Sequence, residues 1–415
     1  MEIQTYNKGD IVGKLRLDKN VYDASIERIG WTFDNFESIY LSFSAGKDST
    51  VMLHLVIQEA IKRNRKIGLL LVDLEGQYSL TIEHAEKMIE EYNEYLDVYW
   101  VCLPLSLRNA VSVYEPQWIC WDEDKKDDWI REPYKNAITD LDYFDFFKKG
   151  MEFEDFVPLF GEWYSKEKET ACLVGIRADE SLNRFRTIAN TKKVKKQDKQ
   201  YTTKVTDKVF NVYPIYDWKT EDIWTYHAKN KDKRYNELYE LMNKAGLSLS
   251  LQRICQPYGD DQRRGLWLFH LIEPNTWAKV VARVSGANSG ALYVQESGNI
   301  NGYNKITKPS HLTWKQFAEL LVESMPPQTK DHYKVKIGTF IKWWSDKGYP
   351  NGIPDEADNS LEMAKKVPSW RRICKSLLRN DYWMKGLSFT QHKTDAYKKY
   401  LAMKKAKKYD KGLFA

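Results

Sequence analysis

One short stretch, residues 38–50, constrains the fold of this chain more than any other. It consists of an apolar segment ending at Phe43, a turn of small and polar residues, and a run over 49–62 whose apolar side chains recur at helical spacing. The turn residues are Ser44, Ala45, Gly46, Lys47 and Asp48. Small residues let backbone N–H groups converge at a helix N-terminus, where the macrodipole already favours negative charge. The stretch therefore predicts a strand, an anion-binding turn and a helix.

The turn does not match a Walker A loop. That loop needs a glycine five residues before the Gly-Lys pair and a serine or threonine directly after the lysine. This chain has Leu41 and Asp48 at those positions. Residues 44–49 instead resemble the Ser-Gly-Gly-x-Asp-Ser loop of the PP-loop ATP pyrophosphatases, the adenine nucleotide alpha hydrolase superfamily. The first glycine of that loop is Ala45 here, and alanine tolerates fewer backbone conformations than glycine.

Further apolar runs of strand length follow, at residues 66–73, 98–103 and 171–176, and a helical pattern over 80–95 separates the first two. This alternation predicts an α/β fold with a doubly wound, mostly parallel sheet. Asp73 and Glu75 follow the first of these runs. Polar groups in that position lie where open α/β sheets bind ligands.

A dense run of charge follows the 171–176 strand. Arg177 and Arg184 suit phosphate or sulfate oxygens, because a guanidinium fork matches such anions. Asp179 and Glu180 could coordinate a magnesium ion carried by a nucleotide. The alternative is that these four side chains pair with one another as surface ion pairs.

The next landmark is a strand that runs into a turn, where Thr220 can cap a helix. Its residues Pro214, Trp218, Asp222, Ile223 and Trp224 resemble the Pro-x-x-x-Trp-x-x-x-Asp-Ile-Trp/Tyr element of phosphoadenosine phosphosulfate reductases. With the loop, the acidic strand end and the Gly-x-Arg segment, the resemblance to this family covers about residues 25–265.

The resemblance implies binding of ATP with Mg²⁺, cleavage between its α and β phosphates, adenylation of an acceptor and release of pyrophosphate. It implies nucleotide contacts from a set of residues at three strand ends: Ser42, Ser44, Ala45, Gly46, Lys47, Asp48, Ser49, Val72, Asp73, Glu75, Gly175 and Arg177. The catalytic roles fall on Lys47, Asp48, Arg177, Asp179 and Arg184. Asp48 and Asp73 are the carboxylates expected near the magnesium ion.

Two other functions remain open. The first is sulfonucleotide reduction, which the family performs with a cysteine on a C-terminal Glu-Cys-Gly-Leu-His tail. The chain ends in Lys-Gly-Leu-Phe-Ala, so Cys255 or Cys374 would have to substitute. The second is a nucleic-acid-binding regulator that uses the nucleotide pocket as a sensor.

The chain divides into an N-terminal arm and helix at 1–37, a nucleotide-binding domain at 38–265 with an insertion at 104–169, and a mostly helical domain at 266–415 with a basic tail. The insertion is expected to be either a lid over the site or a solvated excursion. The whole arrangement resembles a reductase-like subfamily that includes the A member of the immunoglobulin-binding regulator pair. That resemblance implies a ParB/sulfiredoxin-like protein partner and a regulatory or phage-defence role.

Composition sets further limits. The net charge is only +6, so nucleic acid could bind only through basic clusters such as the loop at 191–208, the arginines of 367–383 and the lysines of 393–411. Five scattered cysteines disfavour a zinc site or a disulfide framework and indicate a reducing cytoplasm. No apolar run reaches the roughly 18 residues of a membrane span, so no membrane association is expected.

Overall fold

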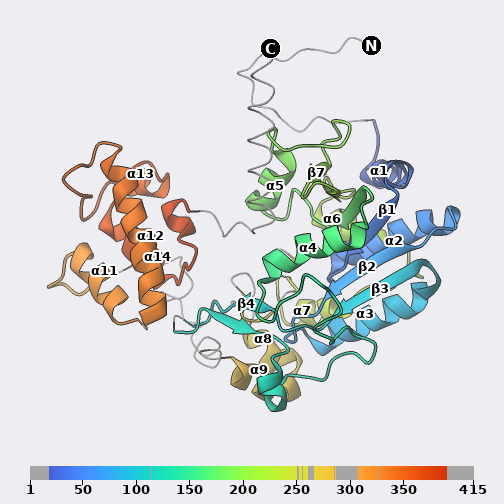
Figure 1. The fold of residues 1–415 in the computed structure, drawn as a ribbon, viewed down its shortest axis with the longest axis horizontal. Coiled ribbons are helices and arrows are strands. Elements are labelled where there is room, and N and C mark those ends of the chain that lie inside the picture. Colours follow the sequence, from blue (N-terminus) through green and yellow to red (C-terminus); the bar gives the residue numbers. More distant parts are fainter. Residues whose placement is uncertain are drawn as a thin grey trace, which may run out of the picture.

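The computed structural model describes residues 18–112, 114–249, 252–254, 256–259, 266–284, 286, 306, 308–325 and 327–389 (Figure 1). Its centre is a six-stranded sheet with the strand order β3-β2-β1-β6-β8-β7. The strands are β1 (Ser38–Ser42), β2 (Ile67–Val72), β3 (Leu96–Val101), β6 (Thr170–Val174), β7 (Thr202–Lys204) and β8 (Val209–Val212). All neighbours pair in parallel except β7, which is antiparallel to β8. The predicted doubly wound α/β fold is confirmed.

Helices cover both faces of this sheet. They are α1 (Val21–Asn35), α2 (Lys47–Lys62), α3 (Ser79–Tyr92), α4 (Phe153–Ser165), α5 (Leu182–Ala189), α6 (Thr220–Lys229) and α7 (Leu238–Lys244). Helix α2 packs with α1 and α6, whereas α4 packs on β6 and β8. The ring of Tyr40 on β1 meets Phe160 and Tyr164 of α4 at centroid distances of 5.3 and 5.2 Å. Right-handed crossovers place helices on both faces of the sheet, because the chain crosses the sheet in one direction from β1 to β3 and in the other direction after β3.

The strand order also fixes where a ligand site can form. From β1 the chain connects outward to β2 and β3, and it returns to β6 on the other side of β1. The crevice between the carboxyl ends of β1 and β6 is therefore the topological switch point, the usual place for a ligand in an open α/β sheet. The loop at 43–46 and the segment after β6 both begin there.

Two segments differ from their sequence-based descriptions. The predicted insertion holds a hairpin of β4 (Ser106–Arg108) and β5 (Gln117–Ile119) and a 3-10 helix, η2 (Glu123–Asp128), but it ends in α4, which belongs to the sheet layers. The basic segment at 191–208, described from the sequence as a loop, carries β7. There Lys196 pairs with Glu169 and lies over the ring of Phe36, so strand pairing and ion pairs give this segment a fixed place.

The structure adds detail on two predicted helices, α6 and α1. The predicted cap at Thr220 is wrong by one position: helix α6 begins at Thr220 itself, and Lys219 takes the cap position, where its N–H donates to the Asp222 carboxylate at 2.7 Å. The N-terminal helix α1 is fastened by Arg28, which makes two bonds of 2.7 Å to the carboxylate of Asp217.

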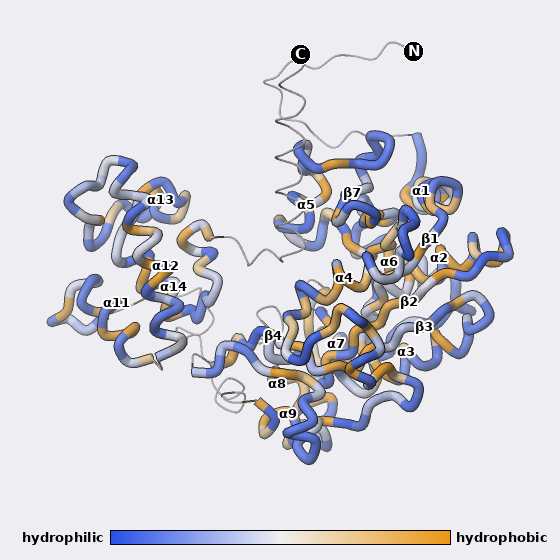
Figure 2. The backbone as a smooth tube through the Cα atoms, in the orientation of Figure 1, coloured by the Kyte–Doolittle hydropathy of each residue, from blue (hydrophilic) through white to orange (hydrophobic). Residues whose placement is uncertain are grey.

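The described residues form two hydrophobic cores. The first contains the sheet and also α8 (Trp267–Ile272) and α9 (Pro274–Arg283). The second is a helical bundle of α11 (Trp314–Glu323), α12 (Pro327–Ser345), α13 (Asn359–Met363), α14 (Trp370–Leu378) and the 3-10 helix η5 (Lys385–Leu387). Figure 2 shows apolar residues along the strands of the sheet and in the bundle. The predicted helical C-terminal region is confirmed, but α8 and α9 pack with the first core, so the predicted division at 265/266 does not separate the two cores.

The bundle contacts the rest of the chain at β4. Arg108 donates to the Asn380 carbonyl at 3.0 Å, and the Asn380 side chain donates to the carbonyls of Ala110 and Ser112 at 3.1 and 3.0 Å. The Arg108 guanidinium also lies 4.9 Å from the ring centroid of Tyr382.

The arginines that were expected to contact phosphate backbones are engaged inside the bundle. Arg371 pairs with Glu356 and Glu362, and Arg372 is buried and donates to the carbonyls of Val367 and Gly386. Both guanidinium groups therefore have partners within the bundle, and nucleic-acid binding through this segment stays a prediction. The lysines of 393–411 lie outside the described residues. Among the described residues, no helix combines the length and apolar content that crossing a membrane requires.

Three histidines are buried around α2: His54 belongs to α2 itself, His84 to α3 and His227 to α6. Burial lowers the pKa of His54 below its ordinary value, and lowers those of His84 to about 3 and His227 to about 4. His84 contacts Thr50 Oγ1 at 3.0 Å, whereas neither ring nitrogen of His227 has a hydrogen-bond partner among the described residues. The folded chain therefore holds these rings neutral, while the unfolded chain protonates them below about pH 6.5.

We predict that the free energy of unfolding falls as the pH drops from about 7 to 5. Each ring with a strongly lowered pKa should contribute about 2 kcal/mol of that loss at about pH 5. His227→Phe should remove the contribution of one ring to this pH-dependent loss of stability, as measured by urea denaturation at both pH values. The exposed His311, replaced by Phe, is the control. An unchanged pH dependence in His227→Phe would contradict the prediction.

Candidate nucleotide site

The loop between β1 and α2 adopts the shape that an anion-binding turn requires. Ala45 has a φ of 54°, in the left-handed region that glycine adopts without strain, which explains why a glycine suits this position in related loops. Gly46 caps α2 with extended backbone and no side-chain cap. The Asn236 side chain donates to the Ala45 carbonyl at 3.0 Å and fixes the turn from α7's side.

Lys47 begins α2 and is almost fully buried. Its backbone N–H donates to the Tyr239 hydroxyl at 3.1 Å, and its ammonium donates to the Gln252 carbonyl at 3.3 Å. The ammonium also lies 3.5 Å from the Asp48 carboxylate and 5.1 Å from the centroid of the Tyr239 ring. Both the N–H and the ammonium of Lys47 thus donate to residues that line one cavity.

Asp48 and Arg177 join the two sides of the switch point. Asp48 lies in the first turn of α2, where a carboxylate is favoured by the helix dipole, and it accepts a hydrogen bond from Arg177 Nε. Arg177 is 1% exposed, and its Nη1 has no hydrogen-bond partner among the described residues. The close approach depends on Gly175, because a Cβ there would lie 3.2 Å from the backbone of Asp48 and Ser49.

A small cavity of about 120 Å³ opens between these elements. The predicted site residues Ser44, Gly46, Lys47, Asp48, Ser49, Gly175 and Arg184 line it. Glu180 also lines it and pairs with Arg184 at 3.0 Å, so part of the ion-pair alternative holds. Burial raises the pKa of Glu180, an effect that Arg184 opposes.

Other predicted residues lie outside this cavity. Ser42 and Val72 end β1 and β2, Ala45 is a buried residue of the loop, and Arg177 donates to Asp48 from outside the cavity. Asp179 is exposed beside the cavity and does not line it.

Asp73 and Glu75 are both enclosed by other parts of the chain. Asp73 accepts from Trp100 Nε1 at 2.9 Å and pairs with Arg131 at 2.5 Å. Glu75 pairs with Arg283 of α9 at 2.7 Å, and both side chains are fully buried. Since Arg131 belongs to the insertion, this segment covers the acidic end of β2.

Sequence reasoning missed the wall of the cavity opposite the loop, which consists of Tyr239, Gln252, Arg253 and Ile254. Tyr239 falls within the range 25–265 that resembles the reductase family, but nothing in its type or spacing indicates a contact with Lys47, which is 192 positions away.

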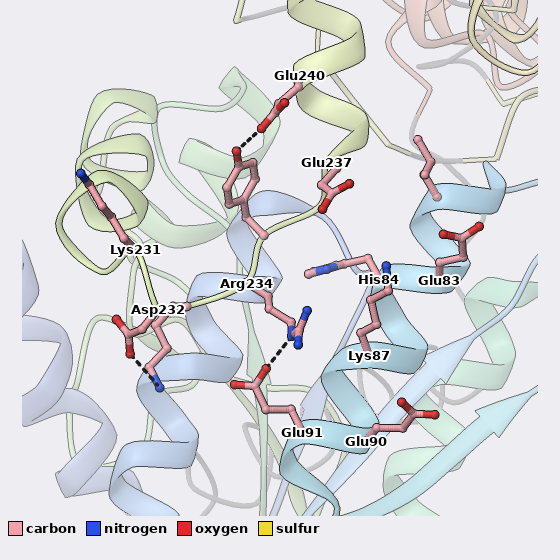
Figure 3. A pocket seen from close by; sticks show the side chains of 13 residues that line it. Glu83, His84, Lys87, Glu90, Glu91, Lys231, Asp232, Arg234, Glu237 and Glu240 are labelled. Atoms are coloured by element: carbon pink, nitrogen blue, oxygen red, sulfur yellow. Dashed lines mark hydrogen bonds and ion pairs between the residues drawn. The ribbon is translucent and has the colours of Figure 1, made fainter.

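A larger groove of about 790 Å³ runs along α3 beside the segment 231–240 (Figure 3). Its side chains are mostly charged, and several pair with each other, as Arg234 does with Glu91 and Tyr235 with Glu240. His84 lies on its wall. This groove has charges of both signs and lies apart from the loop cavity.

A mostly parallel sheet with this loop at its switch point has the features of the PP-loop class of proteins. The family model described as the phosphoadenosine phosphosulfate reductase domain matches residues 38–244, and the domain of unknown function DUF3440 matches residues 246–351. The chain is 44% identical over 403 residues to an uncharacterized Escherichia coli (strain K12) protein, YbdN, covering 96% of this chain and 98% of that one. It belongs to the phosphoadenosine phosphosulfate reductase-like family that carries a C-terminal DUF3440 domain.

Solved structures show weaker similarity. A phosphoadenylyl-sulfate reductase from Candida auris in complex with phosphate is 14% identical with a TM-score of 0.30, over 60% of this chain and 99% of that one. The Candida glabrata FMN adenylyltransferase in complex with ATP is 16% identical with a TM-score of 0.31, over 53% and 57%. The NMN synthetase from Francisella tularensis is 12% identical with a TM-score of 0.31, over 71% and 100%.

We predict that Gly175→Ala destabilises the fold by about 1–3 kcal/mol, because the added methyl forces backbone apart at the switch point. The urea midpoint of unfolding measures this effect. Gly338→Ala is the matched control: an added Cβ meets nothing within 4 Å there, and alanine in a helix gains up to about 1 kcal/mol over glycine. Equal midpoints for Gly175→Ala and the wild type would contradict the close packing.

Proposed function

We propose that this protein binds ATP with its phosphates on the 44–49 loop and transfers the adenylyl group to an acceptor. An acceptor oxygen attacks the α phosphorus, the bond to the β-phosphate oxygen breaks, and pyrophosphate leaves. The observation that carries the proposal is the convergence of Lys47 and the Asp48–Arg177 pair at the N-terminus of α2. Such a transfer depends on positioning and charge stabilisation more than on a covalent nucleophile.

In this proposal the loop N–H groups and Lys47 hold the leaving phosphates. Arg184, which lines the cavity, and the exposed Asp179 would face the acceptor. Arg177 keeps the Asp48 carboxylate in place through its Nε, and so acts as a positioning residue.

Mg²⁺ would arrive with the nucleotide. Within the described ranges, no group of three or more His, Cys, Asp or Glu side chains could hold a metal. Asp48 lines the cavity and can offer a carboxylate oxygen to an ion that the phosphates carry. Asp73 does not fit this role, because its side chain is fully buried and paired with Arg131 and Trp100.

We predict that Lys47→Ala lowers pyrophosphate release from ATP by about a hundredfold or more, the effect expected when one charge-stabilising group is removed. The assay incubates α-labelled ATP with candidate acceptors, with and without a ParB/sulfiredoxin-like partner protein, and follows labelled adduct and pyrophosphate. Lys87→Ala, at an exposed lysine of α3, is the matched control. ATP turnover at the wild-type rate in Lys47→Ala would refute the proposal.

Sulfonucleotide reduction is disfavoured by the state of the cysteines. The described free cysteines, Cys102, Cys120, Cys172 and Cys374, are all buried. Burial raises the pKa of Cys172 and of Cys374 to about 12, so neither is a ready thiolate. Cys255, the other candidate, lies outside the described residues.

Cys374→Ser should therefore leave turnover within about twofold of the wild type, because this thiol packs in the helical bundle against the Trp314 carbonyl at 3.1 Å. Cys255→Ser tests the remaining thiol in the same assay. Loss of activity in a folded Cys255→Ser variant would instead favour sulfonucleotide reduction as the function of this protein.

We also propose a regulatory or phage-defence role with a ParB/sulfiredoxin-like protein partner. Two exposed apolar side chains beside the cavity support a protein contact: Leu182 is 61% exposed and Phe185 49% exposed on α5. Co-purification that survives Leu182→Ser and Phe185→Ser would refute this contact.

Binding of nucleic acid would depend on lysine side chains. The salt dependence of the affinity for DNA would show how many phosphates they contact.

A further inference from the structure

The groups of the loop that should contact phosphate are already occupied by the chain itself. The Tyr239 hydroxyl accepts from the Lys47 N–H at 3.1 Å, so its oxygen sits where a phosphate oxygen would accept. The Lys47 ammonium donates to the Gln252 carbonyl at 3.3 Å. Both acceptors come from the same side of the cavity, opposite the loop.

Residues 252–254, here called the covering segment, are anchored on both sides of the cavity. Gln252 is 1% exposed, and its Nε2 donates to the Leu247 carbonyl at 3.0 Å and to the Asn243 side chain. Arg253 donates to the Glu180 carbonyl at 3.4 Å, beyond the end of β6. The covering segment therefore bridges α7 and the β6 side of the switch point.

The cavity that this arrangement leaves is too small for a nucleotide. It measures about 120 Å³, whereas sites for small organic ligands usually measure about 300–1,000 Å³. An adenine nucleotide can enter only if the covering segment moves and the Tyr239 hydroxyl leaves the Lys47 N–H.

We propose that Tyr239 and the covering segment form an autoinhibitory contact that holds the loop closed until a nucleotide displaces it. The inference rests on the proposed function, since it assumes that the loop binds phosphate. Both displaced acceptors are neutral, and a charged phosphate oxygen forms hydrogen bonds roughly twice as strong, so exchange favours the ligand. Closure weakens apparent binding, because the apparent Kd equals the Kd of the open form divided by the fraction of molecules that are open.

Calorimetric titration with inorganic pyrophosphate and with ATP tests the contact in the full chain. Tyr239→Phe keeps the ring but removes the hydroxyl, and should lower the apparent Kd by about fivefold, the factor for one neutral hydrogen bond. Asn243→Ala removes an anchor of the covering segment from α7 without altering the cavity lining, and should lower the Kd in the same direction.

Tyr235→Phe is the matched control, because its hydroxyl donates to Glu240 and neither residue lines the loop cavity. Its Kd should equal that of the wild type. A purely structural role for Tyr239 would raise the Kd, the opposite sign. An unchanged or raised Kd in Tyr239→Phe, with an unchanged melting temperature, overturns the autoinhibitory contact. If no variant binds either ligand at millimolar concentration, the proposed function fails and this inference fails with it.

Discussion

The pairing of Asp48 with Arg177 is the interaction on which the rest of the site depends. It links the first turn of α2 to the chain after β6, across the only place in the described sheet where connections leave in opposite directions. Arg177 is almost completely buried, and an unpaired buried charge is far more costly than an exposed one. The pair therefore holds the loop at the switch point, and Gly175 permits the approach because it adds no Cβ.

A second buried pair, Glu75 with Arg283, explains how the DUF3440 region joins the nucleotide-binding domain. Glu75 stands at the acidic end of β2, where it also accepts from the backbone N–H groups of Trp121 and Ile130. Arg283 comes from α9 and also donates to the Ile119 carbonyl. The Glu75 carboxylate thus connects the end of β2 to the insertion and to α9 of the C-terminal region. This is why α8 and α9 share the first core, while the helical bundle forms its own.

Much of the fold could be predicted from local sequence patterns. Strand and helix positions followed from apolar periodicity, and the loop residues that line the cavity followed from their small size and charge. Contacts between distant residues could not be predicted, because they depend on how the segments pack. Arg371 and Arg372 have the composition of a phosphate-binding face, yet acidic side chains and backbone carbonyls of the bundle satisfy them. Asp73 likewise has the position of a ligand but pairs with Arg131.

The sequence by itself determined the α/β class, the phosphate-type loop and its family, because these depend on residue types at short spacing. Only the tertiary structure decided which charged groups remain open to a ligand. Tyr239 and Gln252 contact Lys47 although they lie about two hundred positions away in the sequence. These contacts form because the packing of the elements buries the three residues together. Hydrogen-bonding groups removed from water must find partners, and which partners they find is a property of the assembled fold.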